Sequence, residues 1–290
     1  MKVLILGATG MLGYSLFSNL SEHDSLTVFG TVRNLNNKEH FFKPYKGQII
    51  PNIDVYDFNS LEAAINQVKP DVVINCVGLI KQQSISKQHI DAVKINTLLP
   101  HELANLCDRF NARLVHFSTD CVFTGEKGLY TEDDLPDATD LYGKSKCLGE
   151  VSYGNHLTLR TSIIGHELNS SVSLVDWFLS QQDSTKGFCK AVFSGLPTCY
   201  IAKILTETIL PNPELNGLYH LSVDPIDKFT LLNLVAKEYE KEIEIIESSE
   251  LVIDRSLDST RFRVIANFQP PVWSELIEYM HQDFVKRYQA

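Results

Sequence analysis

Residues 1–13 read MKVLILGATGMLG, and this stretch decides the fold. Residues 1–6 form a short apolar run, which predicts a fully buried strand. Residues 11–20 place apolar side chains at helical spacing, which predicts a helix directly after the loop. The three glycines of the stretch therefore lie at a strand-to-helix turn, the context that a phosphate-binding glycine loop requires.

Each glycine of this loop has a distinct expected use. Gly7 would allow the tight turn, and Gly10 would let the backbone approach a pyrophosphate at the helix N-terminus. Gly13 would let the helix pack closely on the strand. The loop therefore predicts dinucleotide binding, with a purely structural glycine turn as the alternative.

Apolar runs alternate with amphipathic stretches through the first part of the chain. The runs predict strands at residues 3–6, 26–32, 48–50, 72–76, 113–118 and 157–161. The stretches between them predict helices near residues 11–20, 60–68, 89–110 and 138–151. This alternation predicts an α/β fold, a Rossmann-type doubly wound parallel sheet with ligands beyond the carboxyl ends of its strands. The polar residues 34–46 are expected to form an exposed loop.

The pattern changes after about residue 165. Helices are predicted at residues 174–181, 200–210, 231–241 and 273–288, separated by short strands and turns. We therefore expect residues 1–165 to form an NAD(P)-binding domain and residues 166–290 a smaller α/β substrate lobe, with some interleaving of the two.

Composition and charge exclude several classes of protein. The formal net charge is −10 over 290 residues and no basic run occurs, which argues against a nucleic-acid partner. The six cysteines form no Cys-x-x-Cys pair and are expected to be reduced thiols, and the histidines lack metal-ligand spacing, so no metal is assigned. No signal peptide or membrane span is visible, so a cytoplasmic protein without a membrane partner is expected. The oligomeric state stays open, with a homodimer as one expectation.

Tyr142 and Lys146 occur in the sequence Tyr-Gly-Lys-Ser-Lys. In a helix over residues 138–152, a spacing of four places the phenol and the ammonium on one face. The cation is expected to lower the pKa of the tyrosine, which would make the phenol a usable proton donor or acceptor near neutral pH.

Thr119 directly follows the predicted strand at residues 113–118, within Phe-Ser-Thr-Asp-Cys. Ligands of a parallel sheet lie at this end of a strand. The Thr119 hydroxyl could hydrogen-bond a substrate carbonyl oxygen beside the Tyr142 phenol and stabilise developing alkoxide charge. Ordinary capping of a helix or turn is the alternative.

The ends of the second and third strands concern the choice of cofactor. Arg33 stands where a carboxylate would bind the ribose of NAD, so a cation there favours NADPH over NADH, although NADH stays open. A solvated loop residue is the alternative for Arg33. Asp54, followed by Val55, could accept a hydrogen bond from an adenine amino group, with a helix cap as the alternative.

The chain resembles an extended short-chain dehydrogenase/reductase, and within that superfamily the dTDP-4-dehydrorhamnose reductase group of sugar-nucleotide reductases. The resemblance covers nearly the whole chain. Its motifs are the glycine loop, Asn75-Cys-Val-Gly78, Asn96, Ser118-Thr-Asp120, Tyr142-x-x-x-Lys146, Leu159-Arg-Thr161, Gly217-Leu-Tyr-His-Leu221 and Arg255-Ser-Leu-Asp-Ser-Thr-Arg261.

This resemblance implies a catalytic trio of Thr119, Tyr142 and Lys146. NADPH would deliver hydride to the ketone carbon of a nucleotide-linked 4-keto-6-deoxy sugar while Tyr142 protonates the oxygen, as a step in surface polysaccharide precursor synthesis. The expected cofactor-binding residues are Gly7, Thr9, Gly10, Met11, Leu12, Gly13, Arg33, Asp54, Val55, Cys76, Val77, Gly78, Asn96, Tyr142 and Lys146. Those expected to bind substrate are Asp120, Cys121, Arg255 and Arg261, the two arginines as partners of a diphosphate or, alternatively, in surface salt bridges.

Cys121 departs from the reductase pattern, which has an aromatic residue at this position. The related dehydratases have a glutamate there, so its absence argues against a dehydratase. A cysteine resembles the acid/base residue of the bifunctional GDP-fucose synthases, which also use a histidine where Ser173 aligns here, with His166 the nearest histidine. A keto-sugar epimerase/reductase using Cys121 is therefore one alternative, and it would need a lowered thiol pKa. A non-catalytic NAD(P)-binding regulator is another, although it would not need Tyr142 and Lys146.

Overall fold

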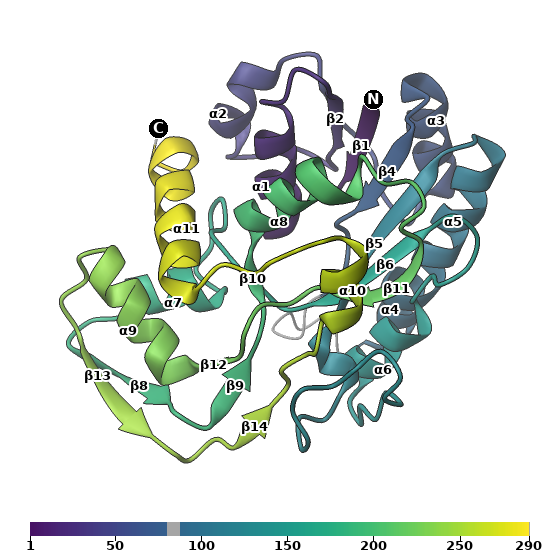
Figure 1. Cartoon of the computed structure of the whole chain (residues 1–290). Coiled ribbons are helices and arrows are strands. Elements are labelled where there is room, and N and C mark those ends of the chain that lie inside the picture. Colours follow the sequence, from purple (N-terminus) through teal and green to yellow (C-terminus); the bar gives the residue numbers. More distant parts are fainter. Residues whose placement is uncertain (80–87, 290) are drawn as a thin grey trace.

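A seven-stranded parallel sheet forms the centre of the protein, which we describe from a computed structural model that covers residues 1–79 and 88–289 (Figure 1). The spatial order of the strands is β11-β6-β5-β4-β1-β2-β3, and every neighbouring pair is parallel. Their bounds are β1 Lys2–Leu6, β2 Thr27–Thr31, β3 Ile49–Ile50, β4 Val72–Asn75, β5 Arg113–Thr119, β6 Leu157–Thr161 and β11 Gly217–His220. The predicted doubly wound sheet is thus confirmed.

Helices cover both faces of the sheet because successive side chains of a strand point to opposite sides. Val3 and Ile5 of β1 belong to one apolar cluster, whereas Leu4 and Leu6 belong to another. The first cluster takes in α1 (Met11–Leu20), α8 (Thr198–Ile204) and α11 (Trp273–Arg287), and the second takes in α3 (Phe58–Val68) and α5 (Leu99–Arg109). Burial on both faces explains why the central strands β1 and β4 are nearly continuous apolar runs.

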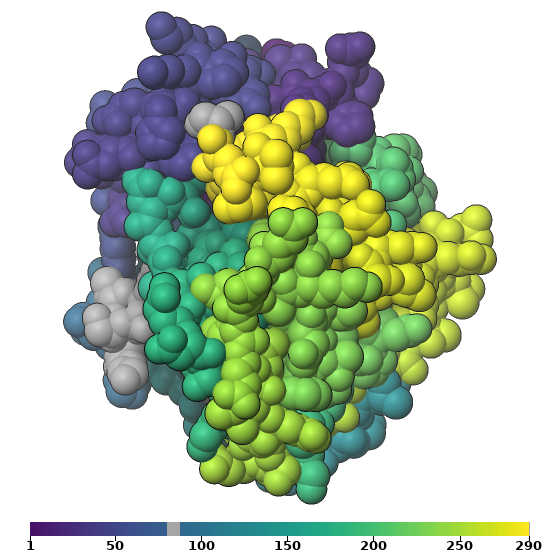
Figure 2. Space-filling view, turned by 90° about the vertical axis from the view of Figure 1, so that its left-hand side faces the viewer, coloured from purple at the N-terminus to yellow at the C-terminus, as the bar shows by residue number. Residues whose placement is uncertain are grey.

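The second half of the chain builds a smaller lobe at the carboxyl ends of the central strands. Its strand pairs are β7 (Ile163–Ile164) with β10 (Leu196–Pro197), β8 (Ser184–Phe188) with β13 (Glu244–Ser248), and β9 (Ala191–Phe193) with β12 (Ile226–Asp227) and β14 (Ile253–Asp254). Its helices are α7 (Leu174–Ser180), η5 (Leu205–Ile209), α9 (Lys228–Glu238) and α10 (Thr260–Ile265). Figure 2 shows green and yellow residues of this half covering one side of the molecule below the purple N-terminal residues.

The two halves of the chain interleave. Strand β11 comes from the second half yet pairs with β6 at the edge of the central sheet. Helix α8 also comes from the second half and packs on α1. Residue 165 is therefore not a boundary of the central sheet, because β11 lies beyond it in the sequence. The division into a cofactor-binding part and a substrate-binding part stays a prediction.

Two local predictions need correction. Residues 34–46 include the short helices α2 (Glu39–Phe42) and η1 (Lys43–Tyr45), because Phe42 is buried and the Phe17 ring packs against the rings of Phe42 and Tyr45. The helix predicted over residues 138–152 is shorter, α6 (Leu141–Leu148), because Asp140 Oδ1 accepts a hydrogen bond from Gly143 N at 2.8 Å and caps its first turn.

The helix predicted at residues 89–110 is present in three consecutive parts. They are α4 (His89–Ala92), a π-helical turn η3 (Val93–Leu98) and α5. A further short helix, η4 (Asp120–Val122), follows β5 directly. The six cysteines, all within the described residues, are free thiols. No helix of the described residues is both long enough and apolar enough to cross a membrane.

Candidate active site

The glycine loop has the geometry that its sequence predicts. Gly7 has a φ of +81°, and a Cβ on Gly13 would stand 2.1 Å from the Gly7 carbonyl oxygen, so both positions require glycine. A Cβ on Gly10 would meet only the Gly7 oxygen, at 3.5 Å. Gly10 therefore has no packing reason to be glycine within the protein, and its open side faces a cavity that it lines.

The N-terminus of α1 is suited to an anion. Gly10 caps α1 without a side-chain hydrogen bond, and the first turn of the helix has no acidic residue. The first N–H groups of a helix need partners, and the helix dipole favours negative charge there. The loop thus fits the pyrophosphate of a dinucleotide.

A cavity of about 620 Å³ runs from this loop across the carboxyl ends of the strands and into the smaller lobe. It is lined by most of the residues predicted to bind cofactor or substrate, namely Gly10, Met11, Leu12, Cys76, Val77, Gly78, Thr119, Asp120, Cys121, Tyr142, Lys146 and Arg255. The structure therefore brings the glycine loop and the three predicted catalytic residues to one site.

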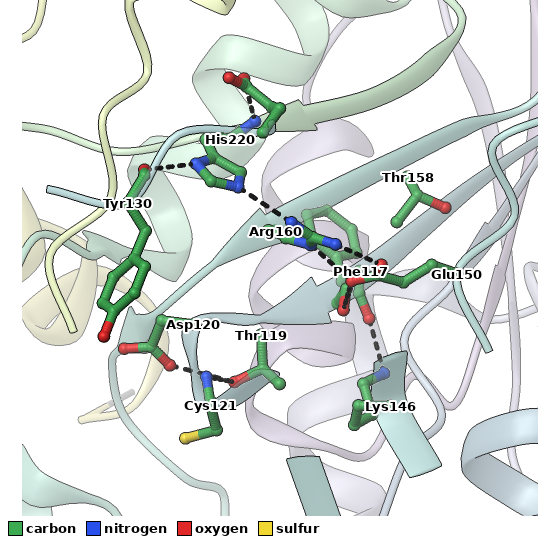
Figure 3. A network of polar contacts seen from close by, with 12 residues as sticks. Phe117, Thr119, Asp120, Cys121, Tyr130, Lys146, Glu150, Thr158, Arg160 and His220 are labelled. Carbon is green, nitrogen blue, oxygen red and sulfur yellow. Dashed lines mark hydrogen bonds and ion pairs between the residues drawn. The ribbon is translucent and has the colours of Figure 1, made fainter. Parts of the chain in front are cut away.

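Lys146 is buried beside the end of β5. Its Nζ donates to the carbonyl oxygen of Phe117 at 2.7 Å (Figure 3). Burial lowers the pKa of Lys146 to about 8, and the negative charge of Glu150 acts in the opposite direction. The ammonium is thus held at the cavity wall, in a setting where its charge depends on its neighbours.

The prediction that the pKa of the Tyr142 phenol is lowered was wrong. Burial raises its pKa above the usual value, the charge of Cys121 adds to that rise, and a hydrogen bond with Thr119 opposes it. Burial is the largest of these effects, so the net shift of the phenol pKa is upward. Tyr142 is therefore fully protonated at neutral pH, which suits a proton donor.

Thr119 lies between Tyr142 and Asp120. Its hydroxyl donates to Asp120 Oδ1 at 3.1 Å and accepts from the Cys121 N–H at 3.1 Å (Figure 3). Burial raises the pKa of the Asp120 carboxyl, while Arg255 and the Thr119 hydrogen bond oppose that rise. The Thr119 hydroxyl thus caps the turn after β5, as the capping interpretation expects, and Thr119 also lines the cavity, so its role toward a substrate stays a prediction.

Asn96 lies behind the cavity wall. Its Oδ1 accepts from Leu79 N at 2.9 Å and its Nδ2 donates to Ser145 Oγ at 3.2 Å. Asn96 belongs to the π-helical turn η3, and such turns often occur at functional sites. It joins the segment after β4 to the helix of Tyr142 and Lys146, and so positions the site.

Other predicted cofactor residues surround the loop without lining the cavity. Thr9 is half-buried, and its carbonyl accepts from Lys38 Nζ at 3.4 Å. Arg33 is exposed after β2, and Val55 packs in the apolar cluster beneath β3. Asp54 Oδ1 accepts from Tyr56 N at 3.0 Å, whereas Asp57 caps α3, so the helix-cap interpretation of Asp54 was wrong.

The two predicted substrate arginines differ in position. Arg255 lines the cavity, and its Nε donates to the Phe123 carbonyl at 2.9 Å. Arg261 lies on α10, outside the cavity wall, where its NH2 group pairs with Asp133 at 2.8 Å. The salt-bridge interpretation describes Arg261, and we leave it out of the proposed site.

Sequence reasoning missed Lys228, the first residue of α9. Lys228 lines the cavity near Arg255 and Asp120, whose charges act on its ammonium. Burial lowers its pKa. Nothing in the sequence distinguishes this lysine from a solvated helix residue, because only the fold brings α9 to the cavity.

The setting of Cys121 does not suit a base. Burial raises the pKa of its thiol to about 12, and the charge of Asp120 adds to the rise. His166, the nearest histidine, binds Asp176 through Nδ1 at 2.5 Å and Tyr239 through Nε2 at 2.8 Å, and it does not line the cavity. Ser173, which does line it, carries no imidazole. These positions argue against acid/base chemistry by the thiol.

Glycine loops are common on parallel sheets, but a tyrosine and a lysine four residues apart, facing such a loop beside a strand-end threonine, are typical of one class. The fold and the arrangement of the site are those of an extended short-chain dehydrogenase/reductase. The chain belongs to the RmlD substrate binding domain family, whose model matches residues 1–285.

Among curated relatives, methionine adenosyltransferase 2 subunit beta of Xenopus tropicalis is 27% identical over 242 residues, or 76% of this chain and 66% of the relative. The chain thus spans just under two thirds of that relative. The spore coat polysaccharide biosynthesis protein SpsK of Bacillus subtilis is 29% identical over 231 residues, or 76% of this chain and 73% of the relative.

Among solved structures, dTDP-4-dehydrorhamnose reductase from Bacillus anthracis, in complex with NADP, superimposes with a TM-score of 0.77. It is 19% identical, and the match covers 97% of this chain and 99% of that one. The match confirms the fold.

Proposed function

We propose that this protein is a cytoplasmic, NADPH-dependent reductase of a nucleotide-linked 4-keto-6-deoxy sugar, acting in the synthesis of a surface polysaccharide precursor. The observation that carries the proposal is that Thr119, Tyr142 and Lys146 line the same cavity as the glycine loop. The Bacillus anthracis reductase with NADP and the polysaccharide protein SpsK support the choice of cofactor and pathway.

The protein's own residues would supply binding and proton transfer. The nicotinamide, when bound, supplies the hydride. Tyr142, protonated because burial raises its pKa, donates its proton to the ketone oxygen as the alkoxide develops. Thr119 orients the same oxygen and stabilises its charge, and the Lys146 ammonium favours the resulting phenolate. Solvent then returns a proton to Tyr142, so the reaction consumes one hydride and one proton for each alcohol formed.

The two cations at the far end of the cavity suit the diphosphate of the substrate. Among the described residues, Arg255 uses only Nε in a hydrogen bond, to the Phe123 carbonyl, which leaves NH1 and NH2 for a ligand. Within the part of the chain that the structure describes, neither Arg255 nor Lys228 forms an ion pair within 4 Å, although the charge of Asp120 interacts with both. A guanidinium and an ammonium in one partly buried wall attract phosphate oxygens strongly.

A second candidate is a non-catalytic NAD(P)-binding subunit. The observation that favours it is the relative named as a subunit of methionine adenosyltransferase, an enzyme name that does not describe a reductase. Such a subunit would bind NADPH without consuming it. The cavity with its complete Thr119, Tyr142 and Lys146 set supports the reductase instead.

NADPH oxidation, followed by absorbance, tests the proposal. The substrates are dTDP- and UDP-linked 4-keto-6-deoxy sugars, each with and without a separate 3,5-epimerase. Consumption of NADPH with at least one of them supports the reductase, and consumption only after epimerisation shows simple reduction. Consumption without the epimerase, with solvent deuterium at carbon 3 or 5, would restore a role for Cys121. NADPH binding without consumption of any substrate supports the subunit instead.

A further inference from the structure

A buried ion pair lies directly behind the catalytic residues. Arg160 Nε and NH2 each donate to one carboxylate oxygen of Glu150, both at 2.7 Å (Figure 3). The side chains are only 5% and 7% exposed. Burying two charges is costly, so such a pair is weak evidence for stability. Its position therefore needs another explanation.

Glu150 is joined to the catalytic end of β5. Its Oε1 also accepts the Ser118 hydroxyl at 2.7 Å. Ser118 lies between Phe117, whose carbonyl binds Lys146 Nζ, and Thr119. Lys146 thus holds Phe117, and Glu150 holds the next residue of β5, Ser118. Glu150 follows Lys146 by four residues in the sequence.

Arg160 is fixed from the opposite side. It lies on β6 directly opposite Ser118 in the parallel register. Its NH1 is 3.4 Å from Nε2 of His220 on β11, and its guanidinium lies 5.3 Å from the centre of the Phe123 ring. His220 in turn contacts the carbonyl oxygen of Tyr130 at 3.0 Å. The orientation of the Glu150 carboxylate is thus set by three neighbouring strands and the segment after them.

We propose that Glu150, oriented by Arg160, is a positioning residue for the Lys146 ammonium and for the Thr119 end of β5. The catalytic meaning of this position rests on the proposed reductase function. The physical claim does not, because it concerns the charge state of one buried lysine.

Glu150 is the carboxylate that acts on Lys146. The other titratable groups near Lys146 on β5, η4 and α6 are His116, Asp120, Cys121, Tyr142 and Cys147. Burial lowers the pKa of His116 and raises those of the other four, and the charge that acts on the Lys146 ammonium is that of Glu150.

The charged side chains of α4 and η3, which pack against α6, have other surroundings. Asp91 accepts from the Tyr56 hydroxyl at 2.6 Å, Lys94 lies over the Tyr56 ring at 5.8 Å, and His89 is exposed. The polar residue of η3 behind the cavity is the uncharged Asn96. Glu150 and its partner Arg160 therefore form the charged pair that can tune Lys146.

Two single substitutions test the claim because they act in opposite directions. Glu150→Gln removes the carboxylate and leaves a cation, so Lys146 should lose its proton at a pH on the order of one unit lower than in the native protein. Arg160→Gln leaves the carboxylate uncompensated, so Lys146 should titrate at a higher pH. The double variant should titrate between the two. The readout is the NMR titration of protein labelled with carbon-13 lysine, with the Lys146 signal assigned by Lys146→Arg.

A merely structural pair would give a different result. Midpoints that stay at the native value, or that move in the same direction in both single variants, would overturn the proposal. One single variant could unfold because it buries an uncompensated charge. The double variant buries no lone charge, so its Lys146 midpoint is then compared with that of the remaining single variant, from which it should differ in the direction of the unfolded one. Glu250→Gln, in an exposed pair with Lys186, is the matched control and should leave the Lys146 midpoint unchanged.

Turnover gives an independent readout. If the proposed reductase activity is present, the alkaline limb of its kcat profile should move in the same direction as the Lys146 midpoint in each variant. Absence of turnover in the native protein would refute the proposed function, and the NMR titration would still test the pair.

Discussion

Gly10 and Gly13 belong to the same loop, but substituting each of them should have a different effect. We expect Gly10→Ala to weaken cofactor binding and Gly13→Ala to lower the stability of the fold. The Gly10→Ala methyl group would contact only the Gly7 oxygen, at 3.5 Å, and would otherwise enter the cavity beside the N-terminus of α1. The Gly13→Ala methyl group would stand 2.1 Å from that oxygen, between helix and strand.

The expected magnitudes follow from these distances. Gly10 has φ −82° and ψ 165°, which alanine adopts, so the loss of a favoured cap and the gain from a stiffer unfolded chain offset each other within about 0.5 kcal/mol. A methyl group that displaces one phosphate-to-amide hydrogen bond costs about 1.5–3 kcal/mol, a tenfold or greater rise in Kd. Overpacking at Gly13 costs about 1–3 kcal/mol, which lowers Tm by several degrees.

Two measurements on each variant decide the matter. Thermal unfolding followed by circular dichroism gives Tm without ligand, and calorimetric titration gives the Kd for NADPH. We expect Gly10→Ala to keep the native Tm and lose NADPH affinity, and Gly13→Ala to lose Tm. Native NADPH affinity in Gly10→Ala would refute the assignment of the loop to the pyrophosphate.

Three further predictions concern the chemistry. Tyr142→Phe should abolish turnover and leave the Kd for NADPH within about twofold of native, because the phenol serves proton transfer; residual turnover above a few per cent would remove Tyr142 from the mechanism. Turnover should fall as pH rises through about 8, since Lys146 loses its proton there and the charged form is the one that favours the phenolate; a flat kcat profile across that range would contradict the role. Lys228→Met should raise KM for the sugar nucleotide roughly tenfold or more with an unchanged Kd for NADPH, because an ion-assisted contact to phosphate is lost. Lys186→Met, in an exposed ion pair, is its control, and equal effects of the two substitutions would count against a phosphate site at Lys228.

The parts of the fold that follow from local sequence were predictable. Residues 3–6 are all apolar because this part of β1 is buried between two layers, so the run indicates its own strand. The spacing of Tyr142 and Lys146 likewise places both on one helix face whichever lobe lies above them. Such features depend on neighbours within a few residues.

Features that depend on distant contacts were not predictable. Burial outweighs the expected influence of Lys146 on the Tyr142 pKa, and burial is a property of the closed cavity. Arg255 and Arg261 are six residues apart, yet one lines the cavity and the other meets Asp133 at the surface. Glu150 did carry a signal, its spacing of four from Lys146, but its pairing with Arg160 needs the register of β5 and β6.

Transfer of deuterium to the sugar from NADPH that carries deuterium at both positions of nicotinamide carbon 4 tests the central claim most directly. The substrate is the nucleotide-linked 4-keto-6-deoxy sugar that supports NADPH oxidation, and the product is analysed by mass spectrometry and NMR. The account predicts one deuterium on the new carbinol carbon with native protein and none with Tyr142→Phe. Product without deuterium at that carbon, or no product from any of the sugar nucleotides while NADPH still binds, would contradict it.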